Sequence, residues 1–274
     1  MRRLINFILR KLKLTKYERY IIKQNKYGRT GNDDFNWEFY NLHYRSEIKN
    51  LEKEFTTLLS VGDYALTGGG LKQTNERKKP LHPNWRLLYE TVLELKPRAV
   101  FEMGVGNGMH LYNLDILNSS LELRGIDRSA DQIRFLKEYT RQNAIFSNIV
   151  LKDATVEFEP SFHKVADVSY TQAVIMHIQS GDNHKKALAN LFKTARNQVV
   201  LMENWLRHEF LSDIQALHTS GETGWDNINF YYKNSPEIND RPHLMVVSRT
   251  PLSMEKYYPL DSYDIMTAPM LNLK

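Results

Sequence analysis

The stretch AVFEMGVGNGMHLYNL, Ala99 to Leu114, decides how the chain folds. Its first part, 99–103, is mostly apolar and predicts a buried strand. Gly104, Gly106 and Gly108 then predict a tight turn, because glycine adopts the backbone conformations that such a turn needs and lets a ligand approach the main chain. The stretch therefore predicts a strand, a glycine-rich turn and a helix, an arrangement that binds ligands at the carboxyl edge of open α/β sheets.

The rest of the chain continues this alternation of short β-rich runs and helical runs. Beyond 99–103 we predict strands at 122–126, 148–151, 166–170, 198–202, 227–232 and 244–248. Helices are predicted at 46–59, 85–95, 109–117, 130–143, 182–195 and 206–218. The alternation is typical of a parallel sheet covered by helices on both faces. We therefore predict a doubly wound α/β fold with a mostly parallel seven-stranded sheet, an antiparallel last strand and a helical N-terminal extension.

Carboxylates follow the predicted strands at regular places. Glu102 stands just before the glycine turn, and Asp127 ends the second strand in LRGIDRS. A carboxylate at the position of Asp127 can accept hydrogen bonds from both hydroxyls of a ribose. Asp153 and Ala154 follow the third strand in VLKDAT. Asp127 and Asp153 are also residues that cap a helix or a turn, so both interpretations stay open.

These segments, in this order, resemble class I S-adenosylmethionine-dependent methyltransferases, which have a Rossmann-like fold. The resemblance covers roughly 85–247 and includes DVSYTQAVIMHI, 167–178, which is similar to the fourth-strand motif of the family. It implies that the cofactor is S-adenosylmethionine. The residues that it implies for cofactor binding are Glu102, Gly104, Gly106, Gly108, Asp127, Arg128, Asp153, Ala154 and Gln172.

His177 is the candidate catalytic base, because it follows the fourth strand and an imidazole can exchange protons near neutral pH. The alternative is a structural histidine. Trp205, His208 and His243 are candidate acceptor-binding residues, as is Glu203. The spacing of the histidines matches no recognised ligand pair, so we expect no metal site.

The segment 62–84 contains three consecutive glycines, two prolines and a basic cluster, and it predicts a long loop beside the cofactor. Lys72 and Arg77 in this predicted lid are candidate contacts to an anionic or sugar acceptor, such as a phosphorylated or nucleotide-linked glycan precursor. A solvated basic loop is the alternative. The predicted organisation is a basic helix in 1–26, an extension and lid in 27–84, a catalytic core in 85–249 and a tail in 250–274.

Residues 1–26 carry nine Lys or Arg and one Glu, with apolar residues at helical spacing. They predict a basic amphipathic helix that attaches to the inner face of an anionic membrane or packs on protein. The chain has no cysteine, which is compatible with a cytoplasmic location and excludes thiolate chemistry. We therefore expect a cytoplasmic enzyme with peripheral membrane contact. Its character is similar to that of small methyltransferases of bacterial surface-polysaccharide pathways.

Two other functions share part of this pattern. A nicotinamide-dependent oxidoreductase also has a glycine turn and a carboxylate like Asp127, but it would explain neither Glu102 nor the segment around Asp153. A non-catalytic scaffold could keep the same fold. Binding of nucleic acid is not expected, because the basic residues concentrate at the N-terminus. The sequence favours O-methylation of a small acceptor by in-line transfer.

Overall fold

A computed structural model describes residues 22–23, 28–30, 34–139, 148–235 and 239–261, without the side chains of 137–139, 235 and 239–243. The basic helix predicted in 1–26 lies outside the described residues, apart from 22–23. Before the sheet core come α3 (Trp37–Leu51), β1 (Tyr64–Thr67), β2 (Gly70–Gln73) and α4 (Pro83–Glu94). The core contains β3 (Ala99–Met103), α5 (Met109–Leu117), β4 (Glu122–Asp127), α6 (Ala130–Tyr139), β5 (Ile149–Leu151), β6 (Ala166–Gln172), α7 (Asn183–Thr194), β7 (Ala195–Met202), α8 (Phe210–Thr219), β8 (Asn229–Ser235), β9 (Asn239–Ser248) and β10 (Tyr258–Pro259).

The large sheet has the strand order β10-β8-β9-β7-β6-β3-β4-β5. Strands β3 to β7 are parallel, and β9 runs antiparallel to both β7 and β8. The strand order reverses beside β3, where open α/β sheets bind ligands. This arrangement confirms the predicted doubly wound, mostly parallel sheet. It contains one strand more than predicted, since the two-residue β10 pairs with β8.

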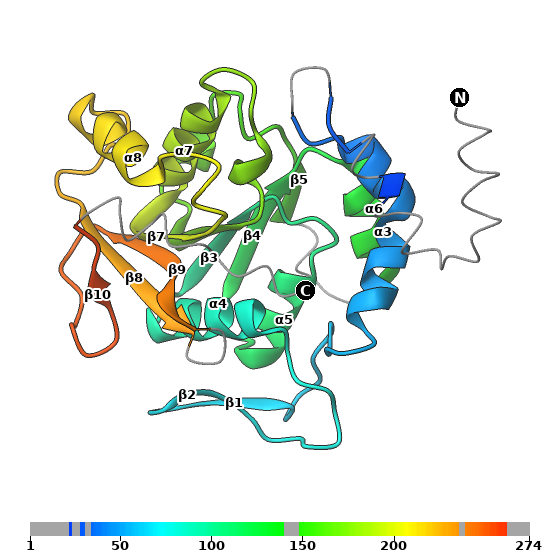
Figure 1. Ribbon diagram of the computed structural model, residues 1–274. Helices are drawn as coiled ribbons and strands as arrows, with labels where there is room; N and C mark the ends of the chain where they lie inside the picture. Colours follow the sequence, from blue (N-terminus) through cyan, green and yellow to red (C-terminus); the bar gives the residue numbers. More distant parts are fainter. Residues whose placement is uncertain (1–21, 24–27, 31–33, 140–147, 236–238, 262–274) are drawn as a thin grey trace.

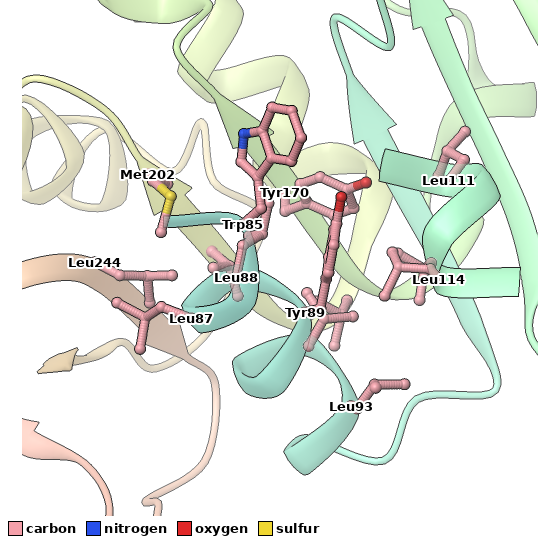
Figure 2. Packing of buried hydrophobic residues seen from close by; sticks show 14 of the residues in the cluster. Trp85, Leu87, Leu88, Tyr89, Leu93, Leu111, Leu114, Tyr170, Met202 and Leu244 are labelled. Atoms are coloured by element: carbon pink, nitrogen blue, oxygen red, sulfur yellow. The ribbon is translucent and has the colours of Figure 1, made fainter. Parts of the chain in front are cut away.

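Two apolar layers, one on each face of the sheet, hold the fold together. Side chains alternate along β3, so that Val100 joins the cluster formed with α4 and α5, whereas Phe101 joins the cluster formed with α7 and α8. The two pairs of helices lie on opposite sides of the strands in Figure 1. Figure 2 shows how Tyr89 of α4, Leu114 of α5 and Tyr170 of β6 pack in the first layer.

The turn between β3 and α5 has the conformation that its glycines predict. Gly104, Gly106 and Gly108 have φ values of 81°, 53° and 74°, in the left-handed region that favours glycine. A Cβ at Gly104 would lie 2.4 Å from Val174 Cγ2, and one at Gly108 would lie 1.9 Å from Leu136 Cδ1. The turn can therefore sit against the loop after β6 and against α6 only because these side chains are missing.

Helix α3 begins earlier than the predicted helix 46–59. Asn36 is its N-cap, and the Asn36 side chain accepts a hydrogen bond from Phe39 N at 3.1 Å. This cap starts the helix at Trp37, within the predicted extension 27–84. In Figure 1, α3 lies beside α6. Asn41 and Tyr44 make the contact, by a hydrogen bond to Ser129 and a ring stack on Phe135.

Two predicted irregular segments contribute to the fold. Within the predicted loop 62–84, β1 and β2 form an antiparallel hairpin, and the Glu90 carboxylate of α4 accepts a hydrogen bond from Leu71 N at 2.8 Å. Within the predicted tail, β10 extends the sheet, and Tyr257 and Leu260 are buried. Both segments lack strong local periodicity, so their pairing depends on tertiary contacts. No helix in the described part of the chain is long and apolar enough to cross a membrane.

Candidate functional site

A cavity of about 400 Å³ lies where strands β3, β4, β5 and β6 end. The loops that follow these strands line one side, and α3 with the start of α4 lines the other. Of the residues predicted to bind a cofactor, the cavity is lined by Gly104, Gly106, Asp127, Arg128, Asp153, Ala154 and Gln172. The fold therefore gathers segments that are up to 68 residues apart in the sequence at one edge of the sheet.

Asp127 connects the end of β4 to the glycine turn. Its Oδ2 accepts a hydrogen bond from Gly106 N at 2.8 Å, and its Oδ1 accepts one from Ser129 N at 2.7 Å. Burial raises the pKa of Asp127, and these two N–H donors and Arg128 oppose that shift. Asp127 therefore supports the turn before α6 through its hydrogen bond from Ser129 N and also lines the cavity, and its contact with a ribose stays a prediction.

Asp153 and Gln172 are held by neighbours at the cavity wall. Asp153 Oδ1 accepts hydrogen bonds from Thr155 N at 2.9 Å and from Thr155 Oγ1 at 2.8 Å. Gln172 Oε1 lies 3.2 Å from His110 Nε2, and the Tyr89 hydroxyl lies 2.8 Å from His110 Nδ1. These contacts fix the two side chains in the absence of any ligand.

Glu102 is one of two predicted cofactor contacts that lie outside the cavity lining. Its side chain is buried in β3, with 1% exposure. Burial raises the pKa of Glu102 well above its usual range, and the nearby Asp127 carboxylate raises it further. Apolar layers cover both faces of β3. The side chain of Glu102, the residue before the last of this strand, therefore points into one of these layers and not into the cavity. Gly108 also lies outside the lining, because it begins α5 and packs on Leu136.

His177 lines the cavity next to two aromatic rings. Its ring centroid is 4.4 Å from that of Phe35 and 5.7 Å from that of Trp37. Burial lowers the pKa of His177 to about 4, and the charges of Arg29 and Arg207 lower it as well. The imidazole is therefore neutral at pH 7. Its Nδ1 is buried and has no hydrogen-bond partner among the described residues.

Glu203 holds the turn that carries His177. Its carboxylate accepts hydrogen bonds from Thr171 Oγ1, Val174 N, Ile175 N and Met176 N at 2.9 to 3.3 Å. The side chain is fully buried at the end of β7, so the prediction that Glu203 lines the pocket is wrong. The residue acts on the site through the backbone of the turn after β6.

The predicted acceptor-binding residues lie away from the cavity. Trp205 is 1% exposed in the layer under α7 and α8, and the His208 ring stacks on His184 at 4.1 Å. Lys72 and Arg77 are exposed on and after the hairpin, on the α4 side. None of the four lines the cavity. His243 belongs to β9, and its side chain lies outside the part that the structure describes.

Sequence reasoning missed the wall opposite the strands. Phe35, Trp37, Tyr40 and Tyr44 line the cavity from α3 and the residues before it, and Trp85 lines it from α4. The signal was present in FNWEFYNLHY, where aromatic residues recur at i, i+3 and i+7 from Trp37. The glycines and aspartates at 28–34 favour a loop and obscure this signal, so the predicted helix begins only at residue 46.

The cavity contains buried polar groups that no described protein atom satisfies. Asn107 Nδ2, Gln132 Oε1 and His177 Nδ1 have no hydrogen-bond partner among the described residues. All three residues line the cavity. Because an unmet buried polar group is costly, three of them in one cavity indicate a polar ligand. Among the described residues, no group of three or more His, Asp or Glu side chains is arranged to hold a metal ion.

No family model and no curated protein match the sequence. Solved structures match the fold at low sequence identity. A TehB-like S-adenosylmethionine-dependent methyltransferase from Corynebacterium glutamicum is 13% identical, with 81% of this chain and 98% of that chain covered and a TM-score of 0.50. An O-methyltransferase from the trans-AT PKS multienzyme of Brevibacillus brevis, in complex with S-adenosyl-L-homocysteine, is 18% identical. The match covers 39% of this chain and 36% of that chain, with a TM-score of 0.34.

The sugar N-methyltransferase KedS8 from a Streptoalloteichus species is 15% identical, with 45% of this chain and 48% of that chain covered and a TM-score of 0.38. The chain thus spans about a third of the Brevibacillus chain and nearly all of the Corynebacterium chain. The match over the greater length agrees with the strand order and with the cavity at the ends of β3 to β6. The chain has the fold of the class I S-adenosylmethionine-dependent methyltransferases.

Proposed function

We propose that the protein is an S-adenosylmethionine-dependent methyltransferase that acts on a small acceptor. The observation that carries this proposal is the cavity itself, in which the glycine turn, Asp127 and Asp153 come together with unsatisfied buried polar groups. Fold alone does not establish activity, so the weight rests on these residues.

The residues of the cavity fit this cofactor in chemistry. The turn at Gly104 and Gly106 lines the cavity with its backbone, Asp127 would hold the ribose, and Asp153 with Ala154 would hold the adenine. S-adenosylmethionine carries a sulfonium and an ammonium group, which carboxylates attract. A dinucleotide would present a pyrophosphate, which the same carboxylates repel. The cavity therefore favours the sulfonium cofactor over a nicotinamide cofactor.

When bound, S-adenosylmethionine supplies a methyl group whose bond to sulfur breaks, with its electron pair left on sulfur, while an acceptor lone pair forms the new bond. The protein has to align the acceptor and exclude water, and positioning supplies much of such an acceleration. His177 Nδ1 is the group that accepts the proton of the acceptor, since it lines the cavity, is neutral at pH 7 and has no described partner. Glu203 holds the turn that presents it.

The anionic glycan acceptor predicted from the basic loop has no support from the cavity. Lys72 and Arg77 lie on the hairpin side of α4, outside the lining. Without them, neither a phosphorylated sugar nor a role in polysaccharide assembly at a membrane follows from the site. O-methylation remains part of the proposal, because a hydroxyl must lose its proton and His177 is placed to take it.

Calorimetric titration with S-adenosylhomocysteine tests the cofactor. We expect binding to the wild-type protein and a loss of about tenfold or more in affinity in Asp127→Asn, since the amide presents one acceptor oxygen in place of two. Asp226→Asn is the matched control, because the Asp226 side chain is 83% exposed and pairs with Arg249. Binding of a nicotinamide cofactor in place of S-adenosylhomocysteine, by protein with a native thermal transition, would contradict the proposal.

A further inference from the structure

We infer that the methyl acceptor is an uncharged aromatic molecule that binds against the wall formed by Phe35, Trp37, Tyr40 and Trp85, here called the aromatic wall. The inference rests on the proposed function and specifies its substrate class. It starts from the chemistry of the part of the cavity that the glycine turn, Asp127 and Asp153 do not occupy.

Three rings of the aromatic wall form one contiguous cluster. The ring centroid of Phe35 lies 4.6 Å from that of Trp37 and 5.5 Å from that of Tyr40. The centroids of Trp37 and Tyr40 are 5.9 Å apart, and all three pairs meet edge to face. Their edges and faces offer a further ring the offset or T-shaped contacts that aromatic pairs prefer. The cluster also touches His177, so a ring bound there lies beside the proposed proton acceptor.

The cluster is fastened to the turn after β6. Phe35 N donates a hydrogen bond to the His177 carbonyl at 3.2 Å, and Asp34 Oδ1 accepts hydrogen bonds from Gln179 N at 2.6 Å and Ser180 N at 2.9 Å. The residues before α3 therefore belong to the same rigid wall as His177. A side chain there is therefore held in position to contact an acceptor.

Among the described residues that line the cavity, none near the aromatic wall is a lysine or an arginine. The imidazoles of the cavity are neutral at pH 7, because burial lowers the pKa of His82 and lowers that of His110 and His177 to about 4. Among the described lining residues, Arg128 and Lys152 are the cations, and both adjoin the carboxylates placed for the cofactor. Arg29 and Arg207 act on His177 through charge but lie outside the lining. An anion here would be desolvated without a partner.

The size of the cavity also favours a small acceptor. Its volume of about 400 Å³ lies at the small end of the range for ligand pockets, about 300 to 1,000 Å³, and the cofactor shares it. The space left for an acceptor is therefore smaller than the whole cavity, which favours a small molecule over a nucleotide sugar. A ring hydroxyl is more acidic than an aliphatic hydroxyl, so its deprotonation demands less of an imidazole whose pKa is lowered to about 4.

The test is a calorimetric titration of the protein, saturated with S-adenosylhomocysteine, with 2-naphthol and with the anionic analogue 2-naphthyl phosphate. We expect 2-naphthol to bind, the phosphate to bind at least about tenfold more weakly, and Trp37→Ala to weaken 2-naphthol binding about tenfold. Tyr258→Ala is the matched control, because Tyr258 is an aromatic residue of β10 with 47% exposure, far from the lining.

Equal or tighter binding of the phosphate, or unchanged naphthol affinity in Trp37→Ala, would overturn the inference. Thermal unfolding of each variant shows that it is folded. The titration is repeated without S-adenosylhomocysteine, so that the two proposals can fail separately. If S-adenosylhomocysteine does not bind but the naphthol pattern holds, the aromatic site stands and the methyltransferase proposal falls.

Discussion

Asp127 supports the fold and also lines the cavity proposed to hold the cofactor. Each of its oxygens accepts one hydrogen bond from the backbone, one from Gly106 N and one from Ser129 N. A carboxylate oxygen can accept two hydrogen bonds, so both oxygens keep capacity for a ligand. The two N–H groups orient the carboxylate before the ligand arrives, which lowers the ordering cost of binding.

His110 couples the stability of the protein to pH. Burial lowers its pKa to about 4, whereas an unfolded chain has a histidine pKa near 6.5. Between these values the unfolded state binds more protons, so the contribution of His110 to stability is present above pH 6.5 and is lost as the pH falls toward 4. We expect wild-type protein to lose roughly 2 kcal/mol more than His110→Asn between pH 7 and pH 5.

Urea unfolding of both proteins at pH 7 and pH 5 measures this difference. Buried carboxylates such as Glu102 and Glu203 have raised pKa values, so their contribution to stability increases as the pH falls. Comparison with the variant cancels this contribution, because both proteins share it. Asparagine can keep a hydrogen bond to Tyr89, which limits the loss of packing. Parallel losses of stability in the two proteins would show that His110 titrates normally.

At the scale of elements, the strand–turn–helix unit depends on the absence of a side chain at Gly108. This residue has φ 74° and ψ 12° and begins α5. A Cβ there would meet the buried Leu136 of α6 as well as adopt a left-handed backbone. We expect Gly108→Ala to lower the free energy of unfolding by about 3 kcal/mol, from backbone strain and overpacking together.

Gly221 supplies the control for backbone strain alone. It has φ 82°, and a Cβ there would have no neighbour within 4 Å. Gly221→Ala should therefore cost only about 1 kcal/mol. The two variants are compared by urea denaturation. If they lose the same stability, the contact between the turn and α6 is looser than the structure indicates.

At the scale of the whole molecule, a buried ionic cluster ties the antiparallel end of the sheet to α4. Lys233 Nζ of β8 lies 2.8 Å from Glu94 Oε2 and 3.3 Å from Glu90 Oε1, and Lys256 Nζ lies 2.6 Å from Glu94 Oε1. The side chains of Lys233 and Glu94 are each 8% exposed. Breaking such a cluster leaves a buried carboxylate short of a partner.

We expect Lys233→Met to destabilise the protein by about 3 kcal/mol, because Glu90 and Glu94 then face each other without the lysine between them. Lys256→Met should cost less than about 1 kcal/mol, since the Lys256 side chain is 42% exposed and water replaces its charge. Chemical denaturation followed by circular dichroism measures both. A Lys233 variant as stable as the Lys256 variant would mean that the cluster does not hold the sheet to α4.

The sequence by itself determined the strand–turn–helix unit at 99–117 and the positions of the carboxylates that follow the next two strands. The helix predicted at 109–117 has those bounds in the structure, and Asp127 and Asp153 lie at the cavity as their positions after the strands required. These features follow from local rules. Alternation of apolar residues, glycine at left-handed positions and carboxylates at strand ends act over a few residues and can be read without the rest of the chain.

Only the tertiary structure decided which side chains face the cavity from the far side. It placed Trp37 in the cavity wall and Glu203 and Trp205 in the interior, although the sequence predicted Glu203 and Trp205 as acceptor contacts and assigned no role to Trp37. The cavity wall joins residues near position 37 to the turn at 173–178, and the carboxylate of Glu203 finds its donors about 28 residues earlier. Such contacts depend on how helices pack on the sheet, and no local pattern encodes that packing.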